Sequence, residues 1–176
     1  PVADNDDYQT DEDTTLVIDA AAGVLDNDSD LESEALVVSA LDDSQTLGTV
    51  TLNDDGSFTY VPPQDFSGID TFAYTVSDGQ GGFATATVSV TVNAVNDSPV
   101  VAAPAARTIA EDSPLAIPGV SISDLDAAEG SGNVLATLEV GQGTITVNAA
   151  ATGGVPLANV TGNGTSSVTL LGTPAQ

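Results

Sequence analysis

Acidic residues stand at corresponding places in the two halves of this sequence. Each half carries, in the same order, a Pro-Val pair, a Glu-Asp pair and an Asp-rich segment: Pro1-Val2, Glu12-Asp13 and 26–30, then Pro99-Val100, Glu111-Asp112 and 124–126. Carboxylates that return at fixed places in a repeat suit ion ligands, because calcium takes about six to eight oxygens, many of them from loop carboxylates. The spacing therefore predicts two tandem modules with calcium ligands in their loops.

The charge of the chain is strongly acidic and unevenly divided. The net charge is −25, from 26 acidic residues against the single basic residue Arg107, and residues 1–98 hold 20 of the acids. Such a surface repels nucleic acid and anionic membranes, so neither is an expected partner. Because clustered carboxylates also repel one another, a compact state calls for cations. Disorder is the rival interpretation, but 41% of the residues are hydrophobic, which favours a globular protein.

Several residue types are missing, and each absence excludes a class of chemistry. The chain has no Cys, His or Lys. It therefore cannot form disulfides, Ser-His-Asp triads, lysine Schiff bases or most zinc sites. No apolar run approaches the roughly 20 residues of a membrane span, so no direct membrane insertion is expected. No signal peptide is visible, and the segment is expected to be a piece of something larger.

Alternation of apolar and polar residues predicts a protein built almost wholly of strands. The apolar residues of 71–77 fall on one face at period two, 84–92 repeats the pattern, and the turn residues of 78–82 join the two runs. Further strands are expected at 16–18, 36–38, 49–52 and 57–61, with a helical turn at 20–22. The predicted fold class is all-β, an Ig-like Greek-key sandwich. Its core is expected to hold the inward-facing aromatic residues Phe58, Tyr60, Phe72 and Tyr74.

The expected domain boundaries follow from where this strand pattern stops. Residues 1–95 form the first sandwich, 96–99 a linker that ends at Pro99, and 100–176 a second sandwich. In the second unit 143–147 echoes 48–52, and a strand is expected at 167–171. The sequence after this strand has no counterpart of the last two strands of the first unit, so the second sandwich is expected to be incomplete at its C-terminus.

Two common calcium motifs do not fit the Asp-rich segment that starts at Asp26. An EF-hand loop needs Gly at its sixth position and Glu at its twelfth, where this chain has Leu31 and Val37. The glycine-rich nonapeptide repeat fails as well, because Gly81-Gly82 leads directly into the strand that begins near Phe83.

The pattern resembles the cadherin-like repeats of large bacterial surface and adhesin proteins. Four motifs carry the resemblance: Glu12-Asp13-Thr14, Asp28-Ser29-Asp30, the segment Phe-Ser-Gly-Ile-Asp-Thr-Phe-Ala-Tyr-Thr-Val-Ser-Asp-Gly at 66–79, and Asn96-Asp97-Ser98-Pro99-Val100. They cover the whole first unit, and Glu111-Asp112 with the 124–126 segment extend the likeness more weakly into the second.

The resemblance implies calcium at the junctions between repeats, with neighbouring repeats as partners through the metal. One site would combine residues of both units and the linker: Glu12, Asp70, Asn96, Asp97, Asp124 and Asp126. A half-site at the top of the first unit, completed by a preceding repeat, would use Asp4, Asn5, Asp6, Asp28, Asp30 and Asp78. In an Ig-like sandwich the Asp28/Asp30 and Asp78 loops share one end, which agrees with this grouping.

Simpler interpretations of the same residues remain open. Asp-rich loops are often solvated turns, because Asp hydrogen-bonds its own backbone. Asp70 is alternatively a structural acceptor at a strand start, Asp54-Asp55 a turn signal, and Glu111-Asp112 a ligand for a further junction.

The function expected from the resemblance is a calcium-rigidified extender or adhesion module of a secreted or cell-surface bacterial protein, such as a biofilm adhesin. The alternative is a calcium-dependent module that binds cell-surface or matrix polysaccharide, although the chain has no Trp for a stacking platform. An enzyme is not expected, because the acids lie in turns and no cleft-forming insertion is evident. A threonine-rich strand face at 85–91 also invites an ice-binding interpretation, which rests on that one strand alone.

Overall fold

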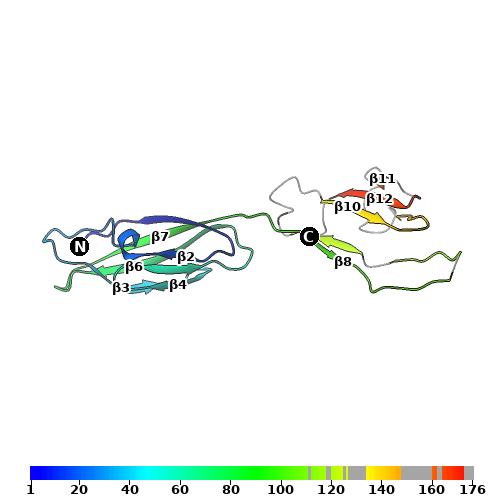
Figure 1. Ribbon diagram of the computed structural model, residues 1–176. Helices are drawn as coiled ribbons and strands as arrows, with labels where there is room; N and C mark the ends of the chain where they lie inside the picture. The colour runs from blue at the N-terminus through cyan, green and yellow to red at the C-terminus, as the bar shows by residue number, and fades with distance from the viewer. Residues whose placement is uncertain are drawn as a thin grey trace. The chain divides into compact units, whose positions relative to one another are not determined.

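The computed structural model describes residues 1–110, 112–117, 120–124, 126, 134–147, 160–161 and 164–172. The chain divides into two compact units, Pro1–Val95 and Asn96–Gln176, each of which is described by itself (Figure 1).

Unit 1 is a sandwich of two sheets. The larger sheet has the order β1 (Asp6–Asp11), β7 (Phe83–Asn93), β6 (Gly68–Ser77) and β3 (Val37–Asp42), and the smaller has the order β2 (Leu16–Ile18), β5 (Phe58–Val61) and β4 (Thr49–Leu52). β1 runs parallel to β7, and the other pairs are antiparallel. The all-β prediction is confirmed, and the helical turn expected at 20–22 is the short 3-10 helix η1 (Ala20–Ala22), which Asp19 caps.

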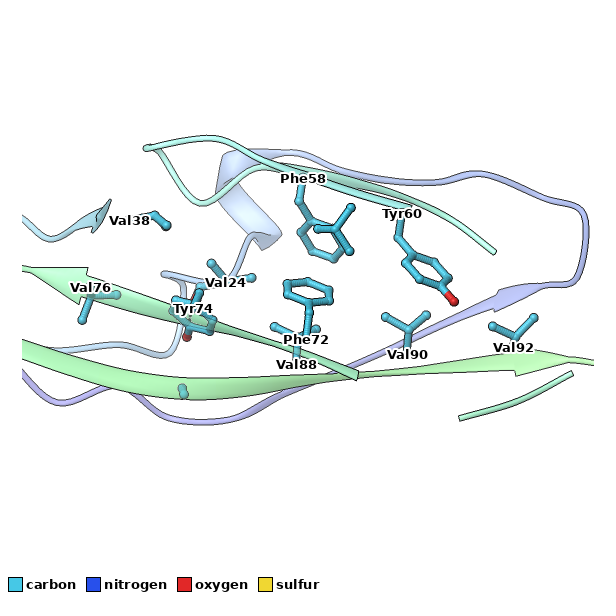
Figure 2. Close-up of a cluster of buried hydrophobic side chains, with 12 residues drawn as sticks. Val24, Val38, Phe58, Tyr60, Phe72, Tyr74, Val76, Val88, Val90 and Val92 are labelled. Atoms are coloured by element: carbon cyan, nitrogen blue, oxygen red, sulfur yellow. Dashed lines mark hydrogen bonds between the residues drawn. The ribbon is translucent and has the colours of Figure 1, made fainter. Parts of the chain in front are cut away.

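The core of unit 1 lies between the two sheets, as Figure 2 shows. β6 contributes Phe72, Tyr74 and Val76 at every second position, and β7 contributes apolar residues from Ala86 to Val92 in the same way. Phe58 of β5 meets Phe72 edge to face, with ring centroids 5.5 Å apart. This geometry adds to the burial of two large apolar side chains. The four aromatic residues assigned to the core from the sequence are all 3% exposed or less.

The hairpin between β4 and β5 depends on one glycine and one aspartate. Gly56 has a φ of +85°, in the region that favours glycine. Asp55 Oδ1 accepts hydrogen bonds from Ser57 N at 3.0 Å and from Ser57 Oγ at 2.6 Å. These are the contacts of a turn residue, and they agree with the turn interpretation of Asp54-Asp55.

Unit 2 holds two smaller sheets among its described residues. β8 (Val100–Ala102) pairs with β9 (Ser121–Ser123), and β12 (Ser167–Gly172) lies between β10 (Val134–Glu139) and β11 (Val160–Thr161). The strand predicted at 167–171 is confirmed as β12. Residues 143–147, which echo 48–52, hold an isolated bridge between Ile145 and Thr165 among the described residues.

A backbone feature supports the repeat relation between the units. Asp13 has a φ of +55° and Asp112 a φ of +57°, and both are the second residue of the repeated Glu-Asp pair. A left-handed conformation is uncommon for residues other than glycine. Its recurrence at the matching position indicates the same turn in both units.

Candidate metal sites

The structure brings together the loop residues that were predicted at one end of unit 1. We refer to this set as the upper cluster: Asp4, Asn5, Asp6, Asp28, Asp30 and Asp78. Asp4 and Asn5 immediately precede β1, Asp28 and Asp30 lie in the loop between η1 and β3, and Asp78 lies in the turn between β6 and β7. These segments meet because β1 is parallel to β7, so the start of β1 lies at the end of the sheet where β6 turns into β7.

The first half of the upper cluster gathers around Tyr74. The Tyr74 hydroxyl lies 3.1 Å from Asp6 Oδ2 and 3.2 and 3.1 Å from Asp28 Oδ1 and Oδ2. Asp28 Oδ1 also accepts a hydrogen bond from Asp4 N at 2.8 Å. Asn5 is anchored beside them, because its Oδ1 accepts from Thr87 N at 2.9 Å and its carbonyl accepts from Asn27 Nδ2 at 3.1 Å.

The carboxylates of Asp6 and Asp28 carry an electrostatic penalty in the folded chain. Burial raises the pKa of Asp6 from 3.8 to about 6, and the hydrogen bond from Tyr74 offsets only part of this effect. Burial also raises the pKa of Asp28, against the hydrogen bonds from Asp4 N and Tyr74. An acid with a raised pKa is one whose charged form is disfavoured. A bound cation would relieve that penalty.

The second half of the upper cluster lies around Pro1. The amino nitrogen of Pro1 is 3.0 Å from Asp30 Oδ2. Asp78 Oδ1 accepts hydrogen bonds from Gln80 N at 2.7 Å and Gly82 N at 2.9 Å. A Cβ atom on Gly82 would lie 2.2 Å from Asp78 Oδ2 and 2.7 Å from Pro1 Cδ. The Asp30 and Asp78 loops thus share Pro1 as a neighbour.

Two further acids in this region were not identified from the sequence. Carboxylate oxygens of Asp30, Glu32 and Glu34 all lie within 4.8 Å of one another. A hydrogen bond with the Asp30 carboxylate raises the pKa of Glu34 above its ordinary value, while the hydrogen bond with the amino group of Pro1 lowers the pKa of Asp30 to about 2. The sequence did contain a pattern that points to Glu32 and Glu34, because acids continue at every second position from Asp26 to Glu34.

The predicted ligands at the other end of unit 1 have mainly backbone partners. Glu12 is 7% exposed, and its Oε1 accepts a hydrogen bond from Val95 N at 2.6 Å. Asp70 is 3% exposed. It accepts from Leu47 N, Gly48 N and Thr71 N at 2.8–3.0 Å, and from the Tyr60 hydroxyl at 2.8 Å. Burial alone would raise the pKa of Asp70, but these hydrogen bonds outweigh it and lower the pKa. The contacts favour the structural-acceptor alternative for Asp70.

In unit 2 the structure brings together the four predicted ligands of that unit. Asp97 N donates a hydrogen bond to Asp126 Oδ2. Asp126 N donates to Asp124 Oδ1 at 3.2 Å, and Asn96 Nδ2 donates to the Asp97 carbonyl at 2.6 Å. The segment before β8 is therefore tied to the loop that follows β9. We refer to Asn96, Asp97, Asp124 and Asp126 as the lower cluster.

The three aromatic residues outside the predicted core, Tyr8, Phe66 and Phe83, differ in exposure. Tyr8 packs edge to face on Phe58, with ring centroids 4.9 Å apart, and Phe66 packs against the core. Phe83 is 64% exposed. The exposed ring of Phe83 offers only a small stacking surface for a sugar, so it gives the polysaccharide-binding alternative little support.

A β-sandwich with acidic loops gathered at its end is the architecture of a cadherin-like repeat, and the family comparison agrees. Residues 1–94 match the family model described as the bacterial cadherin-like domain, and the chain belongs to this family. Domains of this kind are in general extracellular and not enzymatic, and membership of the family suggests an extracellular adhesion or extender module.

Comparison with solved structures found cadherin extracellular domains. The chain is similar to extracellular cadherin domains 3–6 of Protocadherin Gamma B2, with 15% identity, a TM-score of 0.49 and coverage of 97% of this chain and 37% of that one. It is also similar to human CDH23 EC21-23, with 13% identity, a TM-score of 0.43 and coverage of 99% and 52%. The chain thus spans only part of the structures it matches. The search of curated proteins found no match, and none of the described helices is long and apolar enough to cross a membrane.

Proposed function

We propose that this chain is a calcium-binding extender module of a large secreted or cell-surface bacterial repeat protein, and that calcium makes it rigid. The observation that carries the proposal is the upper cluster, where acids from three separate segments converge at one end of the sandwich. Lys and His are absent from the whole sequence, and Arg107 is its only basic side chain. The chain therefore has almost no side-chain cations of its own to neutralise such a group.

The donor set of the upper cluster suits calcium. Calcium is a hard cation that takes carboxylate, amide and carbonyl oxygens on flexible loops, and the cluster offers five carboxylates and the Asn5 side chain. Glu32 and Glu34 lie close enough to Asp30 to add further oxygens. Calcium bound here would hold the segment before β1, the loop before β3 and the β6–β7 turn in one arrangement.

The lower cluster supports a second calcium in the same way. Its members come from the segment before β8 and from the loop after β9, which are distant in the sequence but hydrogen-bonded to each other. Calcium here would fix the start of unit 2 to its own sheet. In a chain of such repeats each fixed segment removes a hinge, so the metal would set the stiffness and the protease resistance of the rod. Partners through calcium would be the neighbouring repeats.

Thermal unfolding of the full chain in calcium, in magnesium and in chelator tests the proposal. Extracellular calcium modules bind with a Kd of about 10⁻⁴ to 10⁻³ M, and a ligand at 100 times its Kd stabilises by about 2.7 kcal/mol per site. We expect a rise in Tm that calcium gives and equal magnesium does not. The increment should fall with Asp28→Ala/Asp30→Ala and, separately, with Asp124→Ala/Asp126→Ala. Equal effects of the two cations in the wild-type chain would overturn the proposal and leave the acids as surface charge.

The variants need a matched control, because removing acids from a chain this acidic reduces self-repulsion. Asp42→Ala/Asp43→Ala provides it, since both positions are exposed and lie outside the two clusters. This double variant removes the same charge and should keep the full calcium increment.

A further inference from the structure

The hydroxyl of Tyr74 faces more acceptors than it has protons to donate. Besides the carboxylates of Asp6 and Asp28, it lies 2.7 Å from the Val24 carbonyl and 3.3 Å from the Asp4 carbonyl. A phenol carries a single proton, so only one of these contacts is a hydrogen bond at any moment. Tyr74 is 1% exposed and Val24 is fully buried, whereas Asp28 is half-buried and Asp4 is exposed, so water or a cation can reach acceptors that the single proton does not serve.

We propose that Tyr74 is a positioning residue for calcium in the upper cluster. Its hydroxyl holds the carboxylates of Asp6 and Asp28 in place, and the cation satisfies the acceptors that its single proton cannot. This inference rests on the proposed calcium function and adds to it a residue that is not itself an acid. The ring lies in the core on β6 (Figure 2), and the hydroxyl is therefore fixed by packing before any metal binds.

The placement of Tyr74 explains how two distant segments present their acids together. Asp6 opens β1, whereas Asp28 lies in the loop between η1 and β3. The hydrogen bond from the backbone N of Asp4 to Asp28 Oδ1 is one link between these segments, and the Tyr74 hydroxyl contacts both acids. Without the hydroxyl, the buried carboxylate of Asp6 and the half-buried carboxylate of Asp28 would lose the one donor that contacts both of them, and only the bond from Asp4 N would still hold Asp28.

Tyr60 offers a matched control within the same unit. It is fully buried, and its hydroxyl donates to a carboxylate at 2.8 Å, that of Asp70. Asp70 also accepts three backbone N–H groups, so it keeps its position when the hydroxyl is removed. Tyr60→Phe thus deletes a bond of the same kind without touching the upper cluster.

The experiment measures metal affinity in the full chain with terbium as a calcium analogue. All three tyrosines lie in unit 1 and Trp is absent, so tyrosine-sensitised terbium emission, and its competition by calcium, reports on that unit. For Tyr74→Phe we expect a calcium affinity about tenfold weaker, as the loss of a hydrogen bond to a charged group implies, and for Tyr60→Phe a change within about twofold. A purely structural tyrosine would lower the Tm in chelator and leave the calcium affinity of the folded chain unchanged.

The possible outcomes separate this inference from the function on which it rests. Wild-type affinity in folded Tyr74→Phe, measured by calorimetry, would overturn the positioning role and leave calcium binding intact. A wild-type chain that binds neither terbium nor calcium would overturn both. If Tyr74→Phe does not fold, the variant Tyr8→Phe/Tyr60→Phe leaves Tyr74 as the only sensitiser. Retained emission would then support the inference, and lost emission with undiminished calcium binding would refute it.

Discussion

Replacing Asp70 by Asn decides between the two roles that the sequence left open for this residue. In the structure both carboxylate oxygens accept hydrogen bonds: Oδ2 from Gly48 N and the Tyr60 hydroxyl, Oδ1 from Thr71 N, and both from Leu47 N. An Asn side chain can keep its oxygen at the Oδ2 position. Its amide nitrogen would then face Thr71 N, a second donor, and the charge that strengthens the other bonds would be lost.

The magnitude follows from these contacts. Leaving one buried donor unsatisfied costs about 1–3 kcal/mol, and hydrogen bonds to a charged group exceed neutral ones by about 1 kcal/mol. We expect Asp70→Asn to lower the free energy of unfolding of unit 1 by about 2–4 kcal/mol, within the stability of a typical domain. Urea unfolding followed by tyrosine fluorescence measures this quantity, because every tyrosine lies in unit 1.

The comparison of calcium with chelator makes the measurement diagnostic. If Asp70 is a structural acceptor, Asp70→Asn lowers the free energy of unfolding by the same amount in calcium and in chelator. If Asp70 is a calcium ligand, the decrease is larger in calcium. Because the folded pKa of Asp70 is depressed, its contribution is present above the unfolded pKa of about 3.8 and is lost as the pH falls through the folded value. A loss confined to calcium, or a loss below about 0.5 kcal/mol in chelator, would refute the structural account.

Three further predictions concern the upper cluster and the core. The pKa of Asp6 is raised to about 6, so in chelator its contribution to the stability of unit 1 should be greatest below about pH 4 and be lost as the pH rises through about 6. A series of Tm values against pH measures this decline, and both calcium and Asp6→Asn should make it smaller. Gly82→Ala, whose Cβ would lie 2.2 Å from Asp78 Oδ2, should weaken calcium binding in titrations, whereas Gly141→Ala, with no atom within 4 Å of its Cβ, should not. Phe58→Ala should destabilise unit 1 by about 3–5 kcal/mol in urea, because Phe58 is 1% exposed.

The strands and the core of unit 1 could be predicted because their signal is local. Period-two alternation in β6 and β7 identifies the buried face directly from the sequence, and Phe72 and Tyr74 lie where it placed them. Residues 143–147 show the limit of the method. Their sequence echoes β4, but pairing depends on a partner segment, and among the described residues Ile145 forms an isolated bridge to Thr165 rather than the four-residue pairing of β4 with β5.

The candidate sites were predictable as residues but not as arrangements. The resemblance to cadherin-like repeats implied the residues of the upper and lower clusters, while the hydrogen-bond partners of those residues come from distant segments. The Tyr74 hydroxyl joins Asp6 to Asp28, and Leu47 and Gly48 supply donors to Asp70. No local pattern carries such contacts, because they arise only when the sheets pack. Glu32 and Glu34 were missed for another reason, since the alternation of acids was interpreted only as far as Asp30.

Calorimetric titration of the full chain with calcium tests the central claim most directly. The account predicts saturable binding with a Kd of about 10⁻⁴ to 10⁻³ M, weaker or absent binding of magnesium, and fewer sites when Asp28 and Asp30, or Asp124 and Asp126, are replaced by Ala. An isotherm with no saturable heat, or with heats that calcium and magnesium share equally, would contradict the account.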